Sequence, residues 1–282
     1  MRLLERYKQW GYPQEPISLP TVIRVNTLKA DEKQLITRLK RRGAKLHKIP
    51  YLEHAYTFDA DFSAGSTQEY LLGYYYMQEA ASQLPVHILK PEGVVIDLCA
   101  APGSKTTQLS QYMNNKGVII ACDIHNKRLE KLNNNIERMG CTNVIVQHKD
   151  AQFISDYKIE ADGILLDAPC SGNFCVEKNW LQQRSEEDFV HMQKTQRKLL
   201  KAAVRVLKKG GRLVYSTCSL EKEENEDVVE WALEHVQGLR LLPIDINTGT
   251  PGLTQQTKHC LRMWPKQQGT QGFFVALFDK IY

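Results

Sequence analysis

The sequence lacks the features that mark three special classes of protein. It has no C-x-x-C pair and an odd number of cysteines, seven, so neither a zinc site nor a secreted disulfide framework is expected. No apolar run approaches the roughly 18 residues of a membrane span, and the charged amino-terminal residues contain no signal-peptide core. We therefore expect a cytoplasmic protein that holds no metal and does not enter a membrane.

The composition is that of an ordinary folded chain with a mild excess of basic residues. Its 282 residues, 42% of them hydrophobic, predict one large domain beside a smaller one. We expect these units to span 1–88 and 89–282, and the protein to be a monomer. A net charge of +5 is by itself weak evidence for a polyanionic partner, because many cytosolic proteins are mildly basic.

The small unit combines a β-α-β pattern with clusters of basic and aromatic residues. A strand precedes Asn26, helical spacing covers 30–42, and an extended segment follows from 45. Tyrosines at 70 and 74–76 could stack bases, although such residues more often form a domain interface. A run of cations without any acidic residue suits a phosphate backbone, but it also suits a solvated helix face. The run consists of Arg38, Lys40, Arg41, Arg42, Lys45 and Lys48.

Strands and helices alternate regularly beyond residue 93. A long helical pattern covers 186–208 and is expected to end at Gly210 and Gly211, and another helix is predicted over 223–234. The fold class is therefore α/β, with a doubly wound, mostly parallel sheet. Strands are predicted at 94–98, 118–122, 144–147, 163–166, 212–216, 239–242 and 273–278.

The strand at 94–98 ends abruptly in small residues, and a helical pattern follows. Small residues let a ligand approach the backbone, and the first turn of the helix offers unpaired N–H groups. A phosphate-binding loop is a poor match, because the order is Gly103-Ser104-Lys105 and the expected upstream glycine is Leu98. The dinucleotide pattern G-x-G-x-x-G is missing as well. An adenosine-like ligand without a pyrophosphate fits this turn better.

Acidic residues at the ends of the next two strands complete this ligand site. Asp123 follows the second strand about 20 residues past the turn, where a carboxylate hydrogen-bonds ribose hydroxyls. Asp150 follows the third strand, where a carboxylate could meet an adenine amino group. Each alone is more often a cap or turn residue. Because ligands of open α/β sheets lie outside the carboxyl ends of the strands, we expect both residues in one crevice.

Two cysteines follow the fourth and fifth strands of the large unit. Cys170 lies in Asp-Ala-Pro-Cys-Ser-Gly at 167–172, and Cys218 lies in Ser-Thr-Cys-Ser at 216–219. These strands are neighbours in the usual order, so both thiols should lie in one cleft beside the ligand turn. A lone cysteine is most often a small buried hydrophobe. Two in one crevice, flanked by Pro, Ser, Thr and Gly, favour a thiolate nucleophile.

The stretches at 99–105, 167–172 and 216–219, in this order, resemble the signature of the Sun/nucleolar-protein family of RNA 5-methylcytosine methyltransferases. The resemblance extends from about Arg24 to Phe274, although Gln271 stands where many members have aspartate. It implies a class I methyltransferase fold, an S-adenosylmethionine cofactor and a small amino-terminal β/α RNA-recognition-like domain. The implied cofactor site comprises Cys99, Ala100, Ala101, Pro102, Gly103, Ser104, Lys105, Asp123, Arg128, Asp150 and Asp167.

The resemblance also implies the catalytic roles. Cys218 would add to carbon 6 of cytosine, because carbon 5 is otherwise a poor nucleophile, and Cys170 would assist release of the product. Asp167 would hold the base or contact the methionine part of the cofactor, and both roles stay open. Lys105 would activate a cysteine, bind phosphate, or simply lie on a helix surface. The substrate must present its base turned out of the stack.

Other functions are weighed against this one. A methyltransferase of exocyclic amino groups generally has an aromatic residue where this chain has Cys170, and a DNA cytosine enzyme would need no second cysteine at 218. A non-catalytic RNA-binding assembly factor would have no use for two thiols in a cleft. Because the chain lacks the long extensions of large ribosomal members, we expect tRNA to be the substrate, as in compact archaeal members. Ribosomal RNA is the alternative.

Overall fold

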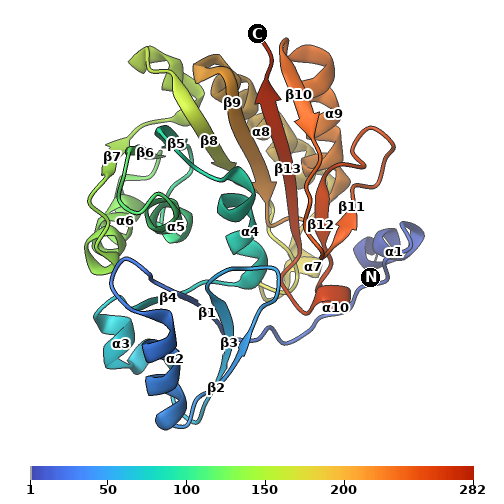
Figure 1. Cartoon of the computed structure of the whole chain (residues 1–282). Helices are drawn as coiled ribbons and strands as arrows, with labels where there is room; N and C mark the ends of the chain where they lie inside the picture. Colours follow the sequence, from blue (N-terminus) through green and yellow to red (C-terminus); the bar gives the residue numbers. More distant parts are fainter. Residues whose placement is uncertain (1) are drawn as a thin grey trace.

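Two separate β-sheets organise the chain (Figure 1). The structure is a computed structural model that describes residues 2–282, with the side chain of Arg2 excepted. The small sheet is antiparallel throughout, in the order β2-β3-β1-β4. Its strands are β1 (Val22–Val25), β2 (Lys45–Lys48), β3 (Ala55–Asp59) and β4 (Tyr75–Met77).

A helix covers the small sheet, as the β-α-β pattern predicts. Helix α2 (Glu32–Arg41) begins where the Asp31 side chain accepts a hydrogen bond from the backbone N–H of Gln34 at 2.9 Å. Leu35 and Leu39, four residues apart, face the sheet and are buried in its core. The short elements η1 (Ala64–Ser66) and α3 (Gln68–Leu71) precede the last strand.

The large sheet is the doubly wound, mostly parallel sheet predicted from the sequence. Its order is β11-β12-β13-β9-β8-β5-β6-β7, with β10 beside β13. Strands β5 to β9 run parallel, and β13 pairs antiparallel with β9. The strands are β5 (Val94–Asp97), β6 (Val118–Asp123), β7 (Val144–His148), β8 (Ala161–Asp167), β9 (Leu207–Thr217), β10 (Leu239–Leu242), β11 (Thr250–Pro251), β12 (Leu261–Met263) and β13 (Phe273–Lys280).

Helices cover both faces of the large sheet (Figure 1). Leu200 of α8 and Val229 of α9 pack into the core on one face, and Leu84 of α4 and Leu109 of α5 pack on the other. None of the described helices is long and apolar enough to cross a membrane. The helical elements are α4 (Ala80–Leu89), α5 (Ser104–Tyr112), α6 (Asn126–Met139), η2 (Ala151–Tyr157), α7 (Trp180–Gln183), α8 (Glu186–Val206), η3 (Lys222–Glu224), α9 (Glu226–His235) and α10 (Pro265–Gln268).

Helix α8 ends earlier than its sequence pattern predicts. The predicted stop at Gly210 and Gly211 is wrong, because the helix ends at Val206 and both glycines lie within β9. Gly210 has a φ of +77°, and the pairing of β8 with β9 shifts register between Ala161 and Gly163. The two glycines therefore accommodate an irregularity of the strand rather than a helix cap.

Arg24 of β1 joins the two units. Its buried side chain donates hydrogen bonds of 2.9 Å to Gln78 Oε1, to the carbonyl oxygen of Ser104 and to Thr107 Oγ1. The guanidinium also lies 5.5 Å from the ring centre of Tyr76. Burial lowers the pKa of Arg24 to about 10, which still leaves the group charged at neutral pH. This residue fixes the small sheet against the start of α5.

Helix α1 (Arg2–Gln9) lies on the large unit, although it precedes the small unit in the sequence (Figure 1). Tyr7 is fully buried and donates a hydrogen bond of 2.5 Å to Glu221 Oε1. Arg6 forms ion pairs of 2.9 Å with Glu221 and 2.6 Å with Glu223. The helix thereby covers the segment that follows Cys218.

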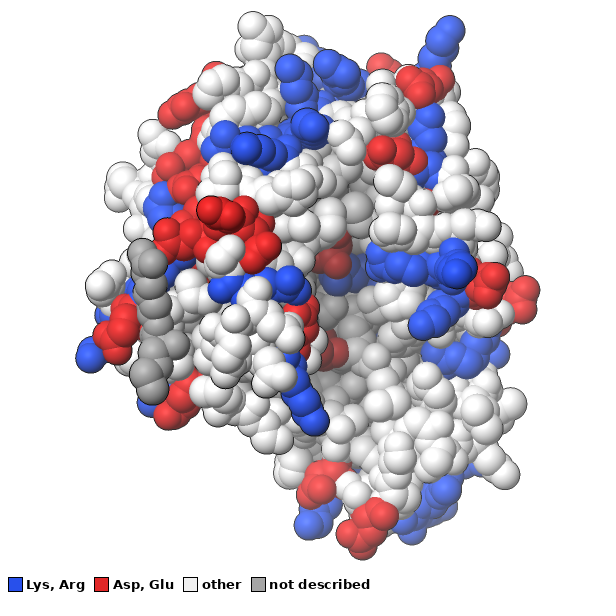
Figure 2. All heavy atoms as spheres, turned by 180° about the vertical axis from the view of Figure 1, so that it is seen from behind, with Lys and Arg blue, Asp and Glu red and all other residues white. Residues whose placement is uncertain are grey.

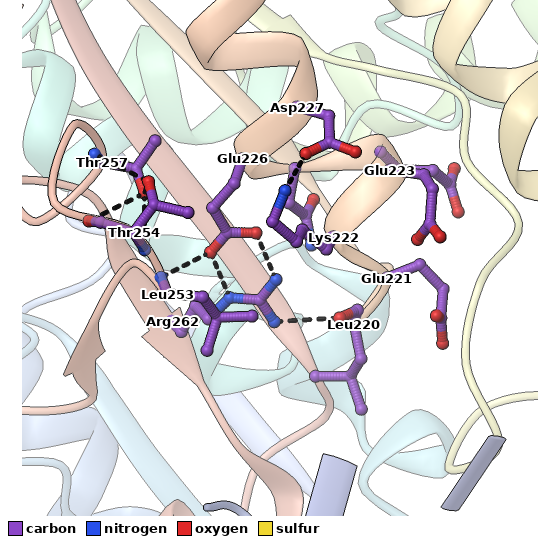
Figure 3. A network of polar contacts seen from close by, with 12 residues as sticks. Leu220, Glu221, Lys222, Glu223, Glu226, Asp227, Leu253, Thr254, Thr257 and Arg262 are labelled. Carbon is purple, nitrogen blue, oxygen red and sulfur yellow. Dashed lines mark hydrogen bonds and ion pairs between the residues drawn. The ribbon is translucent and has the colours of Figure 1, made fainter. Parts of the chain in front are cut away.

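A buried ion pair ties β12 to the start of α9 (Figure 3). Arg262 donates from Nε and Nη2 to the two carboxylate oxygens of Glu226, at 2.6 and 2.5 Å, and both side chains are fully buried. Nη1 of Arg262 donates to the carbonyl oxygen of Leu220 at 2.9 Å. Because burial removes both charges from water, each charge depends on the other for compensation.

We expect Glu226→Ala to lower the free energy of unfolding by about 3–5 kcal/mol, because it leaves the Arg262 guanidinium buried without a counter-charge. Replacing both partners, Glu226→Leu with Arg262→Met, should cost less than the single change. Arg240→Ala, which breaks the surface pair with Asp279, is the control and should have little effect. Denaturant unfolding measures all three, and equal losses for Glu226→Ala and Arg240→Ala would contradict this account.

Candidate active site

The carboxyl ends of β5 to β9 surround a cleft of about 310 Å³. The face of the molecule opposite to that of Figure 1 is hollowed near its centre, with acidic side chains deep in the hollow and basic ones at its rim (Figure 2). The topology thus gathers residues from five strand ends into one place. The residues of the cleft that the sequence predicts are Cys99, Ala101, Asp123, Arg128, Asp150, Asp167, Cys170 and Cys218.

Part of the turn after β5 faces other elements of the fold. Gly103 has a φ of +105°, and a Cβ there would lie 2.8 Å from Leu132 Cδ1 of α6. The glycine is therefore required by the turn and by packing against α6. The carbonyl oxygen of Ser104 accepts its hydrogen bond from Arg24. The predicted cofactor residues that do not line the cleft are Ala100, Pro102, Gly103, Ser104 and Lys105.

Asp123 and Asp150 are oriented by backbone groups at the ends of β6 and β7. Asp123, 2% exposed, accepts hydrogen bonds from the backbone N–H groups of Ala101 at 3.1 Å and His125 at 2.9 Å. Asp150 caps η2 by accepting from the backbone N–H of Gln152 at 2.9 Å. Each carboxylate binds nearby backbone groups and also lines the cleft. The two carboxylates therefore lie in one crevice, as the sequence predicts.

The cleft is acidic. Asp123, Asp150 and Asp167 contribute carboxylates, and the guanidinium of Arg128 lies 3.4 Å from Asp123 and donates to the carbonyl oxygen of Ala101. An excess of carboxylates repels phosphate and attracts a ligand that carries positive charge and hydrogen-bond donors. No group of three or more His, Cys, Asp or Glu side chains within residues 2–282 is arranged to hold a metal ion.

Cys170 and Cys218 face each other, with their sulfur atoms 3.0 Å apart. They follow β8 and β9, which pair in parallel with Asp167 opposite Ser216. The contact with Cys218, burial and the charge of Glu224 raise the pKa of Cys170 well above its usual value. Cys170 therefore keeps its proton near neutral pH and is able to donate it in a hydrogen bond to the sulfur of Cys218.

Asp167, at the end of β8, joins the start of α5 to the end of β9. Its Oδ2 accepts a hydrogen bond from Lys105 Nζ at 2.7 Å, and its Oδ1 accepts one from Ser216 Oγ at 2.8 Å. Lys105 also donates to Ser82 Oγ at 3.0 Å, and only 9% of its side chain is exposed. The interpretation of Lys105 as a helix-surface lysine is therefore wrong, because its ammonium group is turned inward to Asp167.

Two buried polar residues that the sequence analysis did not single out hold the cysteine turns. Glu224 accepts hydrogen bonds from the backbone N–H of Ser171 at 3.0 Å and from Ser219 Oγ at 2.7 Å. Asn173 donates from Nδ2 to the carbonyl oxygen of Cys218 at 2.6 Å. Glu224 belongs to an acidic run, a pattern that is typical of an exposed helix start. The sequence therefore carries no signal for its inward orientation.

Asp97, at the end of β5, is a third residue that the sequence analysis missed. Its Oδ2 accepts a hydrogen bond from Thr106 Oγ1 at 2.7 Å, whereas its Oδ1 is buried without a hydrogen-bond partner. Burial raises the pKa of Asp97 to about 7. An acidic residue inside an apolar strand was the available signal for this site.

The basic run of the small unit is largely engaged in ion pairs. Arg38 and Arg42 both lie 2.8 Å from the carboxylate of Glu69, which is fully buried. The two lysines of the run that follow lie 3.8 and 3.6 Å from carboxylates. Among the described residues, Lys40 and Arg41 are the cations of this run without a carboxylate partner. They are the members most available to a phosphate backbone.

The tyrosine cluster is divided between the core of the small unit and the contact between the two units. Tyr75 is fully buried, and Tyr76, 9% exposed, lies beneath the guanidinium groups of Arg24 and Arg138 at 5.5 and 5.4 Å. Arg138 also lies 4.4 Å from the ring centre of Tyr70. The interface interpretation is correct for Tyr76, which packs with Met139 and Cys141, whereas Tyr75 belongs to the core of the small unit. The base-stacking alternative is wrong for both because their rings are enclosed.

We expect Asp97→Asn to change how stability depends on pH. The folded protein holds the Asp97 proton more tightly than the unfolded chain does, so the wild type loses stability as the pH rises from about 4 to about 7. The neutral asparagine removes this loss, and the variant should gain stability relative to the wild type over that range. Thermal unfolding between about pH 4 and pH 8 measures the difference, and a constant difference would contradict this assignment.

Both parts of the chain match families of known proteins. Residues 86–279 match the family described as 16S rRNA methyltransferase RsmB/F, and residues 13–80 match the N-terminal domain of 16S rRNA methyltransferase RsmF. The chain is 37% identical over 273 residues to ribosomal RNA small subunit methyltransferase F of Shewanella loihica, covering 92% of this chain and 56% of that protein. The chain therefore spans about half the length of this relative.

The chain is also 36% identical over 279 residues to the 28S rRNA (cytosine(4447)-C(5))-methyltransferase of Homo sapiens, covering 93% of this chain and 34% of that protein. Two solved structures from Pyrococcus horikoshii cover almost the whole chain. A methyltransferase homolog protein is 36% identical, with a TM-score of 0.86 and 99% of both chains covered. NSun6, solved with SFG, is 29% identical, with a TM-score of 0.89 and coverage of 99% and 98%.

These likenesses confirm the class I methyltransferase fold and the family resemblance found in the sequence. The family match covers most of the large unit, and the relatives are more than 30% identical over nearly the whole chain. The chain therefore belongs to the RsmB/F family of RNA methyltransferases, in which S-adenosylmethionine is the methyl donor.

Proposed function

We propose that this chain transfers a methyl group to carbon 5 of cytosine in RNA through a covalent cysteine adduct. The observation that carries the proposal is the pair of thiols 3.0 Å apart at the ends of β8 and β9, in a cleft lined by carboxylates. Carbon 5 of cytosine becomes nucleophilic only after another group has added to carbon 6, and a thiolate is suited to that addition. The human relative is named for methylation of carbon 5 of a cytosine in 28S rRNA.

The lining of the cleft fits S-adenosylmethionine. Asp123 would accept hydrogen bonds from the ribose hydroxyls, and Asp150 would accept one from the adenine amino group. When bound, the cofactor supplies an electrophilic methyl group on a positively charged sulfur. The carboxylates of the cleft favour binding of that charge, and Cys99 and Ala101 bring the backbone of the turn to the ligand.

Cys218 would form the bond to the base. Its sulfur adds to carbon 6, and the electron pair displaced from the C5–C6 double bond makes carbon 5 a nucleophile. After methylation, the proton on carbon 5 is lost to water, its electron pair restores the double bond, and the C6–S bond breaks with its pair returning to Cys218. Cys170, protonated and in contact with Cys218, would stabilise the departing thiolate by a hydrogen bond.

Asp167 and Lys105 would position the cytosine. The carboxylate of Asp167 lines the cleft on the same strand end as the Cys170 turn. It would accept a hydrogen bond from the amino group of the base, or from the ring nitrogen, which takes up the proton that the Cys218 thiol loses as its sulfur adds and gives it back when the C6–S bond breaks. The ion pair of 2.7 Å with Lys105 and the hydrogen bond from Ser216 fix its orientation.

Ribosomal RNA is the first substrate to test. The relatives with 36–37% identity are named as ribosomal RNA methyltransferases, and the small unit matches the N-terminal domain of one of them. The expectation of tRNA from the sequence makes tRNA the second substrate. In either RNA the target base must be unpaired or turned out, because a cleft of about 310 Å³ admits a base but no duplex.

Methyl transfer from labelled S-adenosylmethionine to ribosomal RNA and to tRNA tests this proposal. We expect the wild type to produce 5-methylcytidine in one of the two RNAs. Cys218→Ala should produce none, because it removes the nucleophile. Cys170→Ala should accumulate a protein–RNA adduct that survives denaturation, because attack still occurs whereas expulsion of the thiolate is slowed. Nucleoside analysis and denaturing gels provide the two readouts.

Cys175→Ala is the matched control, since this partly buried thiol lies outside the cleft and should leave activity unchanged. An adduct formed by Cys218→Ala would mean that the two thiols have the opposite roles. No product on either RNA, with cofactor binding intact, would instead favour an RNA-binding protein without turnover.

A further inference from the structure

The two cysteine turns meet at one buried carboxylate, that of Glu224. Oε2 accepts hydrogen bonds from the backbone N–H of Ser171 at 3.0 Å and from Gln196 Nε2 at 2.8 Å. Oε1 accepts one from Ser219 Oγ at 2.7 Å and another from Ser171 Oγ. Ser171 directly follows Cys170, and Ser219 directly follows Cys218. One side chain therefore holds both turns immediately beside their thiols.

The backbone that carries Glu224 is itself held firmly. The carbonyl oxygen of Glu224 accepts a hydrogen bond of 2.5 Å from the hydroxyl group of Tyr215, which lies in β9. Asn225 donates to the carbonyl oxygen of Ser219 at 3.0 Å. Figure 3 shows the next anchor, where Arg262 holds the carbonyl oxygen of Leu220. The backbone from which the Glu224 side chain extends is therefore fixed in position.

We propose that Glu224 is a positioning residue that keeps Cys170 and Cys218 at their mutual distance by bonding both turns at once. This inference rests on the proposed function, since it assigns the residue that prepares the same thiol pair. Glu224 is fully buried. Its loss leaves the backbone N–H of Ser171 in the Cys170 turn without this acceptor and removes the partner of the Ser219 hydroxyl in the Cys218 turn.

The placement of the two thiols affects the rate of the proposed methylation reaction. A displacement of about 1 Å of a reacting group can cost about 100-fold in rate, because the bond-forming atoms must meet at a defined distance and angle. The same carboxylate also contributes to the raised pKa of Cys170 through its negative charge. Glu224 therefore acts on both the placement and the protonation of the second thiol, although it does not line the cleft itself.

Glu224→Gln tests the inference, with Glu223→Gln as the matched control. Glu223 lies one residue earlier on the same turn, and its carboxylate binds Arg6 of α1. We expect Glu224→Gln to lower kcat for RNA methylation by about 10- to 100-fold with KM for S-adenosylmethionine nearly unchanged. Glu223→Gln should keep the kcat of the wild type.

A second readout requires neither RNA nor turnover. Alkylation of each cysteine by iodoacetamide, followed across pH by peptide mass spectrometry, reports the protonation of Cys170. In Glu224→Gln its alkylation should begin at lower pH than in the wild type, whereas the buried Cys260 should react as before. Glu223→Gln should leave both profiles unchanged. A purely structural loss would affect the buried cysteines together.

Two results would overturn the inference. One is a Glu224→Gln variant with the kcat and the Cys170 profile of the wild type, and the other is an equal loss of kcat in Glu223→Gln. If Glu224→Gln does not fold, Ser219→Ala removes one of its donors, and a wild-type kcat in that variant would also overturn it. Absence of methylation by the wild type would count against the proposed function alone, because the alkylation profiles still test the role of Glu224.

Discussion

The parallel pairing of β8 with β9 is the constraint on which the candidate site depends. Because Asp167 lies opposite Ser216, the turns that follow both strands leave the sheet at the same level, and their thiols come within 3.0 Å. A slip of one residue would send one turn to the other face of the sheet. The irregularity around Gly210 lies at the opposite end of β9, where it leaves this register intact.

Buried carboxylates in the segment after Cys218 hold the cysteine turns in the positions that this register sets. Three glutamates of one acidic run are turned inward, and each has a separate set of donors. Glu221 binds α1, Glu224 binds both cysteine turns, and Glu226 binds Arg262. Buried carboxylates are tolerable only with such partners, so the segment has few alternative conformations. The carboxylates of the cleft also have partners of their own, but they line the space that a ligand would occupy.

The sequence was sufficient to predict the α/β fold, the neighbouring positions of the strands that precede Cys170 and Cys218, and the meeting of these two thiols, because a doubly wound sheet has a usual strand order. It was insufficient where a residue is compatible with two local structures and a long-range contact selects one of them. Gly210 could end a helix or interrupt a strand, and pairing with β8 selects the strand. An acidic run predicts an exposed helix start, whereas the fold buries Glu224. The basic run predicts a phosphate-binding surface, yet Glu69 pairs with two of its arginines.

The central claim is that Cys218 forms the covalent bond to the base while Cys170 remains a thiol. Reaction with RNA that contains 5-fluorocytosine tests it most directly, because the fluorine on carbon 5 cannot leave as a proton does and the adduct is trapped after methylation. Digestion of the trapped complex and mass spectrometry of its peptides identify the cysteine that carries the nucleotide. We expect the nucleotide on the peptide containing Cys218. Its attachment to Cys170, or the absence of any attached cysteine despite methyl transfer to unsubstituted RNA, would contradict the account.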